Sequence, residues 1–167
     1  RREELAAVRW ADVDFQWNSL TIRDKAESKG GEDGTRTIPL TPYVATLLAA
    51  LPRRNEWVFS SPLSASGRLA DPLTPLQAAM RVAGLPNLSP HDLRRSFGSL
   101  AEWCEVPSGI VAQIMGHKPS ATAEKHYRVR PLDLLRMWHT KIEAWILEQA
   151  GVVFDAEQPA KLRAVKK

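Results

Sequence analysis

Three segments in the second half of the chain carry side chains that could together cut a phosphodiester bond. They are His91-x-x-Arg94, Gly116-His117 and, ten positions after that histidine, Tyr127. An arginine fork can hold two phosphate oxygens, a histidine can exchange a proton near neutral pH, and a phenolic oxygen can act as a nucleophile. These residue types predict covalent phosphoryl transfer carried out by side chains alone.

Each of these residues also has an ordinary structural interpretation, which is the commoner one for that residue taken alone. His91 and Arg94 could be a helix-start histidine followed by a surface arginine, and His117 could cap the carboxyl end of a helix. Tyr127 could be a surface tyrosine held by hydrogen bonds. Because a phenol has a pKa of about 10, it needs a base or cations nearby in order to attack.

Helices are expected to position most of these side chains. A helix over about 91–104 would place His91 and Arg94 on one face, and a helix over 108–115 would stop at the glycine before His117. A third is expected over 121–126. The last helix is expected from Pro131 to about Gly151, and it carries an apolar stripe at helical spacing: Leu135, Trp138, Ile142 and Trp145.

The first half of the chain predicts a β-hairpin flanked by helices. Segments 19–23 and 35–40 alternate in side-chain character as strands do, and a loop rich in Gly, Lys and Glu joins them. An amphipathic helix is expected to run through Leu5 and Val8 and to end at Trp10. Further helices are expected over 42–51 and 74–82. The predicted fold class is therefore mainly α with a small antiparallel sheet (α+β).

Composition sets the broad class. The chain has 167 residues, of which 44% are hydrophobic and 25% charged, as in a globular domain with a substantial core. Its net charge of +4 is compatible with a nucleic-acid partner without requiring one. Cys104 is the single cysteine, so no internal disulfide forms and a cytoplasmic location is expected. No membrane span, metal site or cofactor is predicted.

The motifs, taken in order, resemble the catalytic domain of the tyrosine recombinase, or phage integrase, family. The SPHDLRRSF stretch at 89–97, the IMGH sequence ending at His117, and Tyr127 are similar to its later motifs. Arg1-Arg-Glu-Glu-Leu5 resembles its first arginine motif, with Arg1 in the catalytic place and Glu4 in a structural acidic place. The hairpin resembles its lysine-bearing turn. The resemblance covers roughly residues 1–150 and implies the integrase-like fold of DNA breaking and rejoining enzymes.

The resemblance implies site-specific DNA recombination without ATP or metal. Tyr127 would attack the scissile phosphorus, form a 3′-phosphotyrosyl bond and free a 5′-hydroxyl, and religation would reverse that step. The implied roles of the other residues are phosphate binding by Arg1 and Arg94, proton acceptance by His91, hydrogen bonding to the phosphate by His117, and protonation of the leaving oxygen by Lys25. Lys29 is the alternative lysine; Lys25 is preferred because it directly follows the strand.

The implied partner is double-stranded DNA, and the implied oligomer on DNA is a homotetramer. A bacterial or phage origin and an association with the nucleoid are also implied. The helix at 131–150 would either pack within its own chain or be exchanged between protomers, and both alternatives stay open. Further candidate DNA contacts are Lys29, Arg95, Lys118, Arg128 and Arg130. The last two arginines could equally be ordinary surface charges.

Domain boundaries follow from the same resemblance. Residues 1–154 would form the catalytic domain, and 155–167 a basic, disordered tail. Because the first motif begins at Arg1, the chain is expected to lack the first helices and the amino-terminal DNA-binding domain, and to be weakly active. Two other functions are alternatives. One is DNA relaxation as in type IB topoisomerases, against which His91 argues because that family usually has lysine there; the other is a non-catalytic DNA-binding remnant.

Overall fold

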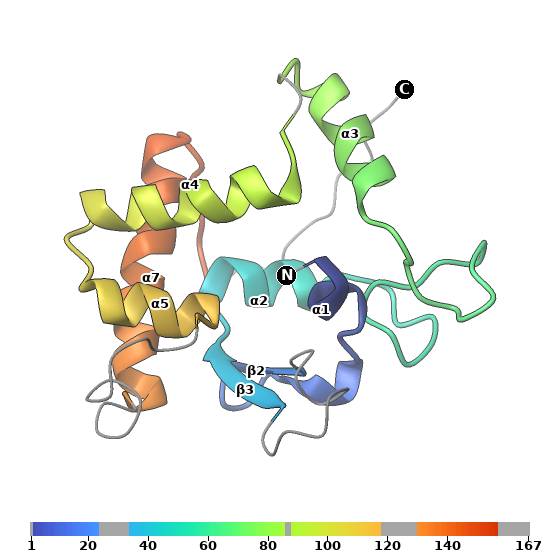
Figure 1. Ribbon diagram of the computed structural model, residues 1–167, viewed down its shortest axis with the longest axis horizontal. Helices are drawn as coiled ribbons and strands as arrows, with labels where there is room; N and C mark the ends of the chain where they lie inside the picture. The colour runs from blue at the N-terminus through green and yellow to red at the C-terminus, as the bar shows by residue number, and fades with distance from the viewer. Residues whose placement is uncertain (1, 24–33, 86–87, 118–129, 157–167) are drawn as a thin grey trace.

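The computed structural model describes residues 2–23, 34–85, 88–117 and 130–156. The elements of this part of the chain are α1 (Arg2–Ala6), η1 (Trp10–Asp12), β1 (Val13–Asp14), β2 (Ser19–Arg23), β3 (Thr35–Pro39), α2 (Pro42–Ala49), α3 (Leu73–Val82), α4 (Pro90–Trp103), α5 (Ser108–Met115) and α7 (Leu132–Gln149). Figure 1 shows α4, α5 and α7 gathered on one side of the molecule, with α3 on the other. The expected fold class is confirmed.

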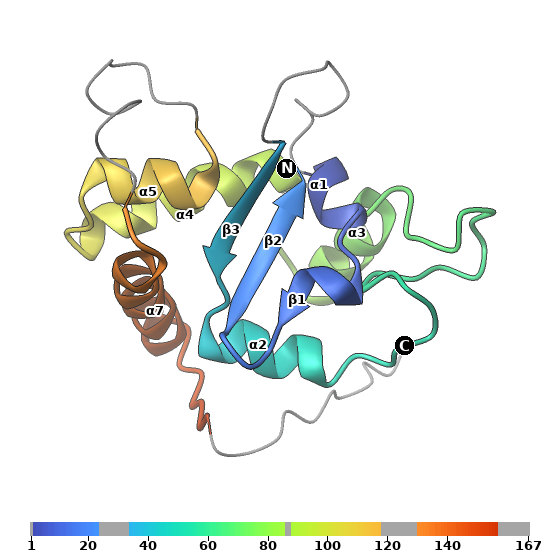
Figure 2. The same ribbon diagram turned by 90° about the horizontal axis from the view of Figure 1, so that it is seen from below.

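The sheet is antiparallel in the order β1-β2-β3. The predicted hairpin forms in the register that runs from Ser19 opposite Pro39 to Arg23 opposite Thr35. Figure 2 shows the sheet from its open face, with α2 along one end and α4 and α5 beyond the other. The sequence pattern did not predict β1, since two residues are too few to display alternation.

Apolar side chains form two clusters. One joins α4, α5 and α7, and its buried members are Ala101, Cys104, Val106, Ile110, Ile114, Leu135 and Ile142. The other joins the sheet to α2 and to the segments before and after them, with Val8, Val13, Leu20, Leu40, Leu48 and Val58. The helical cluster packs α4 and α5 against α7. This packing sets the spacing between α4, which carries His91 and Arg94, and α5, which precedes His117.

Charged side chains on α7 secure the ends of two other helices. The Glu143 carboxylate accepts hydrogen bonds from the Tyr43 and Val44 amides at the start of α2, at 3.0 and 3.3 Å. The Lys141 ammonium donates to the Cys104 carbonyl at the end of α4, at 2.9 Å. Each charge has the sign that the helix dipole favours at that end. Leu135 and Ile142 of α7 are fully buried against the rest of the described chain.

His139 of α7 is a titratable group placed where a positive charge is unfavourable. Its Nδ1 lies 3.2 Å from the Pro39 carbonyl oxygen, and its ring packs edge-on against Phe97 at 5.7 Å between centroids. Burial lowers the pKa of His139, and this outweighs the opposing effects of the Pro39 carbonyl and Glu143. The folded chain therefore binds a proton at this ring less readily than the unfolded chain does.

Stability should consequently fall as the pH drops below the unfolded histidine pKa of about 6.5. We expect the urea midpoint of the wild type to decline more between about pH 8 and pH 5 than that of His139→Gln, which does not titrate. Glutamine can still donate a hydrogen bond to Pro39. Equal declines in the two proteins would show that His139 does not contribute to acid sensitivity.

The amino-terminal helix differs from its prediction. It ends at Ala6 instead of Trp10, and Leu5 is half exposed (49%) while Glu4 is buried. Glu4 is buried because it pairs inside the protein with Arg36 of β3. The helix does not continue to Trp10 because the Arg9 amide donates to the Asp12 carboxylate, which begins a separate turn there. The helices predicted over 42–51, 74–82, 91–104 and 108–115 are confirmed to within two residues at each end.

The predicted helix over 121–126 lies outside the described residues, as does 157–167 of the predicted tail. None of the helices in the described part of the chain is both long and apolar enough to cross a membrane.

Candidate active site

The first turn of α4 presents two of the predicted residues. Ser89 and Asp92 form a reciprocal capping box, in which the Ser89 hydroxyl accepts from the Asp92 amide at 3.2 Å and the Asp92 carboxylate accepts from the Ser89 amide at 2.9 Å. The Ser89 hydroxyl also donates to the Asp92 carboxylate at 2.7 Å, and this bond, together with that from the Ser89 amide, lowers the pKa of Asp92. His91 and Arg94 follow within one turn, where the positive end of the helix dipole favours an anion.

The carboxyl end of α5 presents the third residue. Gly116 ends the helix with a φ of +66°, a left-handed conformation that glycine adopts without strain. The His117 amide still donates to the Ala112 carbonyl at 2.8 Å, so the turn is closed and His117 leaves it in a defined direction. The Arg94 guanidinium donates to the Met115 carbonyl of this turn, which ties α4 to α5.

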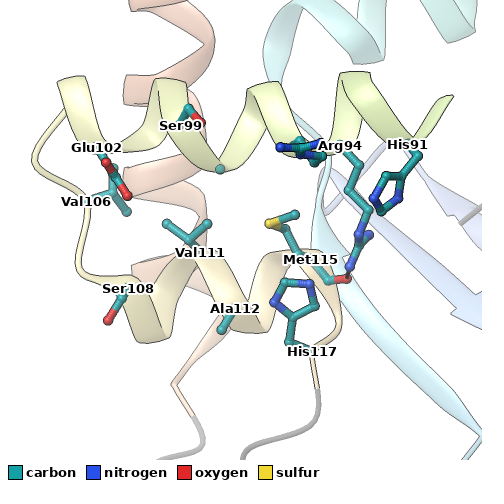
Figure 3. A pocket seen from close by; sticks show the side chains of 12 residues that line it. His91, Arg94, Ser99, Glu102, Val106, Ser108, Val111, Ala112, Met115 and His117 are labelled. Atoms are coloured by element: carbon teal, nitrogen blue, oxygen red, sulfur yellow. Dashed lines mark hydrogen bonds between the residues drawn. The ribbon is translucent and has the colours of Figure 1, made fainter. Parts of the chain in front are cut away.

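His91, Arg94 and His117 line one cavity between α4 and α5, with a volume of about 680 Å³. In Figure 3 the Arg94 side chain reaches from α4 toward Met115, with His91 beside it and His117 facing them from the end of α5. Ser99, Glu102 and Ser108 lie at the other end. Arg95, a predicted DNA contact, also lines the cavity. The site therefore combines two guanidinium groups with two imidazoles, a set suited to a phosphate diester.

A buried ion pair lies next to this cavity. Arg36 Nη2 of β3 is 2.7 Å from Glu4 Oε2 of α1, and only 3% of the Glu4 side chain is exposed. Burial alone would raise the pKa of Glu4, but the hydrogen bond and charge of Arg36 reverse this effect and lower it from 4.5 to about 2. Glu4 is therefore ionised at neutral pH, and the pair is intact.

Arg130, which precedes α7 in the sequence, contacts α5 through both its backbone and its side chain. The Gln113 side chain donates to the Arg130 carbonyl at 3.1 Å and accepts from the Arg130 amide at 3.3 Å. The Arg130 guanidinium lies against Gly109, where an added Cβ would meet it at 2.2 Å. Arg130, predicted as a possible DNA contact, thus also joins the chain after Tyr127 to α5.

Several predicted residues lie outside the described part of the chain: Arg1, Lys25, Lys29, Lys118, Tyr127 and Arg128. Sequence reasoning overlooked Arg36 and Gln113. For Arg36 a signal was present. It lies two residues before Ile38, on the same inward-facing side of the strand, and an apolar residue is usual on that side. For Gln113 there was none, since a glutamine in a helix is ordinary.

Comparison with known proteins decides the family. The model of the phage integrase family matches residues 1–131, which is most of the chain. The chain belongs to the phage integrase family. The resemblance drawn from the ordered motifs is thereby confirmed.

Among its relatives is the prophage integrase IntF of Escherichia coli (strain K12), 58% identical over 159 residues, which make up 91% of this chain and 33% of that protein. Another is the tyrosine recombinase XerA of Pyrococcus furiosus, 29% identical over 136 residues, or 77% of this chain and 46% of that protein. This phage integrase family member thus spans a third to a half of the length of these relatives.

The fold agrees with a solved structure of the family. The integrase from mycobacterium phage Brujita superimposes with a TM-score of 0.62 at 23% identity, over 95% of this chain and 48% of that one. At this identity the match supports the integrase catalytic fold.

Proposed function

We propose that the chain is the catalytic domain, over residues 1–154, of a tyrosine-type site-specific DNA recombinase. The observation that carries this proposal is the convergence of His91, Arg94 and His117 on one cavity, from the start of α4 and the end of α5. Tyrosine recombination requires a phosphate-binding cation and proton-transfer groups at a single point. The names of the relatives, a prophage integrase and a tyrosine recombinase, support the same reaction class.

In the proposed reaction the phenolic oxygen of Tyr127 attacks the scissile phosphorus while its proton passes to His91. The bond from phosphorus to the 5′-oxygen breaks, and Lys25 (or Lys29) gives that oxygen a proton. Arg1 and Arg94 bind the non-bridging oxygens as negative charge builds on them, and His117 donates a hydrogen bond to one of them. Attack by a 5′-hydroxyl reverses these steps and restores Tyr127, so the phosphodiester energy is conserved.

The proposed partner is double-stranded DNA held by a tetramer of protomers. Arg95, which lines the cavity, would contact phosphates beside the scissile one, and Lys118, Arg128 and Arg130 would extend that contact. Exchange of the 131–150 helix between protomers would keep the helix-end hydrogen bonds of α7, because Glu143 and Lys141 would cap the same helices on a neighbour.

A nicked suicide DNA substrate carrying the recombination site tests the reaction class. When the short strand beyond the nick diffuses away, religation fails and a covalent adduct accumulates even if turnover is slow. We expect a protease-sensitive band on a denaturing gel, with protein attached to the 3′ end.

Peptide mapping of the adduct would identify the nucleophile, because the chain has two tyrosines, Tyr43 and Tyr127, in different segments. A nucleotide found on the peptide that contains Tyr127 supports the proposal. The absence of any adduct would favour a non-catalytic DNA-binding remnant. Relaxation of supercoiled plasmid without strand exchange would favour the topoisomerase alternative.

A further inference from the structure

The inner face of the sheet carries a charged side chain at a position where the strand pattern predicts an apolar one. Arg36 of β3 shares that face with Ile38, which packs against the sheet cluster. Only 19% of the Arg36 side chain is exposed. Removing a guanidinium from water costs free energy unless it is paired, so its contacts indicate its role.

The first contact joins Arg36 to the amino-terminal helix. Its Nη2 lies 2.7 Å from Glu4 Oε2, and the Glu4 side chain is 3% exposed. This pair neutralises the guanidinium inside the protein, and it fixes one edge of the planar group against α1.

The second contact is with the backbone of the turn that carries His117. A Cβ built on Gly116 would lie 2.6 Å from both Cζ and Nε of Arg36, and 3.0 Å from its Nη1. The guanidinium therefore occupies the space in which a side chain of residue 116 would lie. Gly116 is in contact with this group through its own backbone and directly precedes His117.

The same turn also receives the guanidinium of Arg94, which donates to the Met115 carbonyl. Residues 115–117 are thus contacted by two arginines, one from α4 and one from β3. Arg94 lines the cavity, whereas Arg36 is absent from its lining. A phosphate bound in the cavity could therefore contact Arg94, whereas Arg36 could act on it only through the turn.

We propose that Arg36 is a positioning residue, which sets the place of His117 by packing its Glu4-neutralised guanidinium against Gly116. This inference rests on the proposed function, in which His117 donates a hydrogen bond to the scissile phosphate. Lysine at this position would keep the charge that pairs with Glu4 but would lose the flat surface against Gly116. The turn could then shift, and misplacement of a catalytic group by about 1 Å can lower a rate by about 100-fold.

The test compares Arg36→Lys with wild type in three measurements: the rate of suicide-substrate adduct formation at saturating DNA, the affinity for DNA, and the imidazole NMR signal of His117 without DNA. His117→Gln identifies that signal. The control is Arg136→Lys, because Arg136 also joins two elements, by donating from α7 to the Trp17 carbonyl at 2.7 Å. If Arg36→Lys does not fold, the uncharged pair Glu4→Gln with Arg36→Met replaces it.

We expect Arg36→Lys to slow adduct formation about 10- to 100-fold with a change in affinity of about twofold or less, and to shift the His117 signal. Arg136→Lys should leave all three measurements at their wild-type values. A wild-type rate, or an unshifted His117 signal, in a folded Arg36 variant would overturn the inference. If wild type itself forms no adduct, the proposed function fails, while the His117 signal still decides whether Arg36 positions that residue.

Discussion

Tyr127→Phe should abolish covalent attachment of the protein to DNA, because it removes the oxygen that forms the new bond to phosphorus. The expected decrease in adduct formation is at least about 10⁴-fold, since a benzene ring offers no substitute nucleophile. DNA affinity should change by about twofold or less, because one hydroxyl makes a small part of a binding surface governed by phosphate contacts. A suicide-substrate gel and a fluorescence-anisotropy titration measure the two quantities.

The chain supplies a matched control in its other tyrosine. Tyr43 of α2 packs its ring edge-on against Phe154, with 5.2 Å between the ring centroids, and phenylalanine would keep that contact. Tyr43→Phe should therefore form the adduct at the wild-type rate. An adduct that survives Tyr127→Phe but is lost in Tyr43→Phe would show that the nucleophile had been assigned wrongly.

Arg94→Ala is expected to have the second-largest effect, a decrease of about 10³-fold in the rate of adduct formation at saturating DNA. The side chain has two consequences for the reaction. In the proposed reaction it binds the scissile phosphate, and in the structure it donates a hydrogen bond to the Met115 carbonyl in the turn before His117. Arg94→Lys should recover little of this rate, since an ammonium cannot form the planar fork that contacts both groups.

Arg95 provides the comparison for Arg94, because it lies next to it on α4 and lines the same cavity. Its expected contribution is to DNA affinity, so Arg95→Ala should weaken binding and make it less dependent on salt. At saturating DNA its adduct should form at close to the wild-type rate. Similar rate losses in both variants, measured under that condition, would mean that Arg94 has no special role in the chemical step.

The short-range features of the site could be predicted from the sequence because they depend on neighbouring residues. Gly116 ends α5 where it was expected to, and the two alternating segments form the strands β2 and β3. These local signals, with the motif order, were sufficient to predict the family, the hairpin and the helices that carry His91, Arg94 and His117. They could not show that the three side chains meet at one cavity.

Only the tertiary structure decided the contacts between distant segments. Arg36 pairs with Glu4 across 32 positions, and Glu143 caps α2 from 100 positions away. A strand pattern records which face a side chain occupies, but it does not record which helix covers that face, because this depends on how the whole chain packs. The sequence by itself therefore determined the chemistry available to this protein. The packing of β3 against α1 and the end of α5 determined which residues support it.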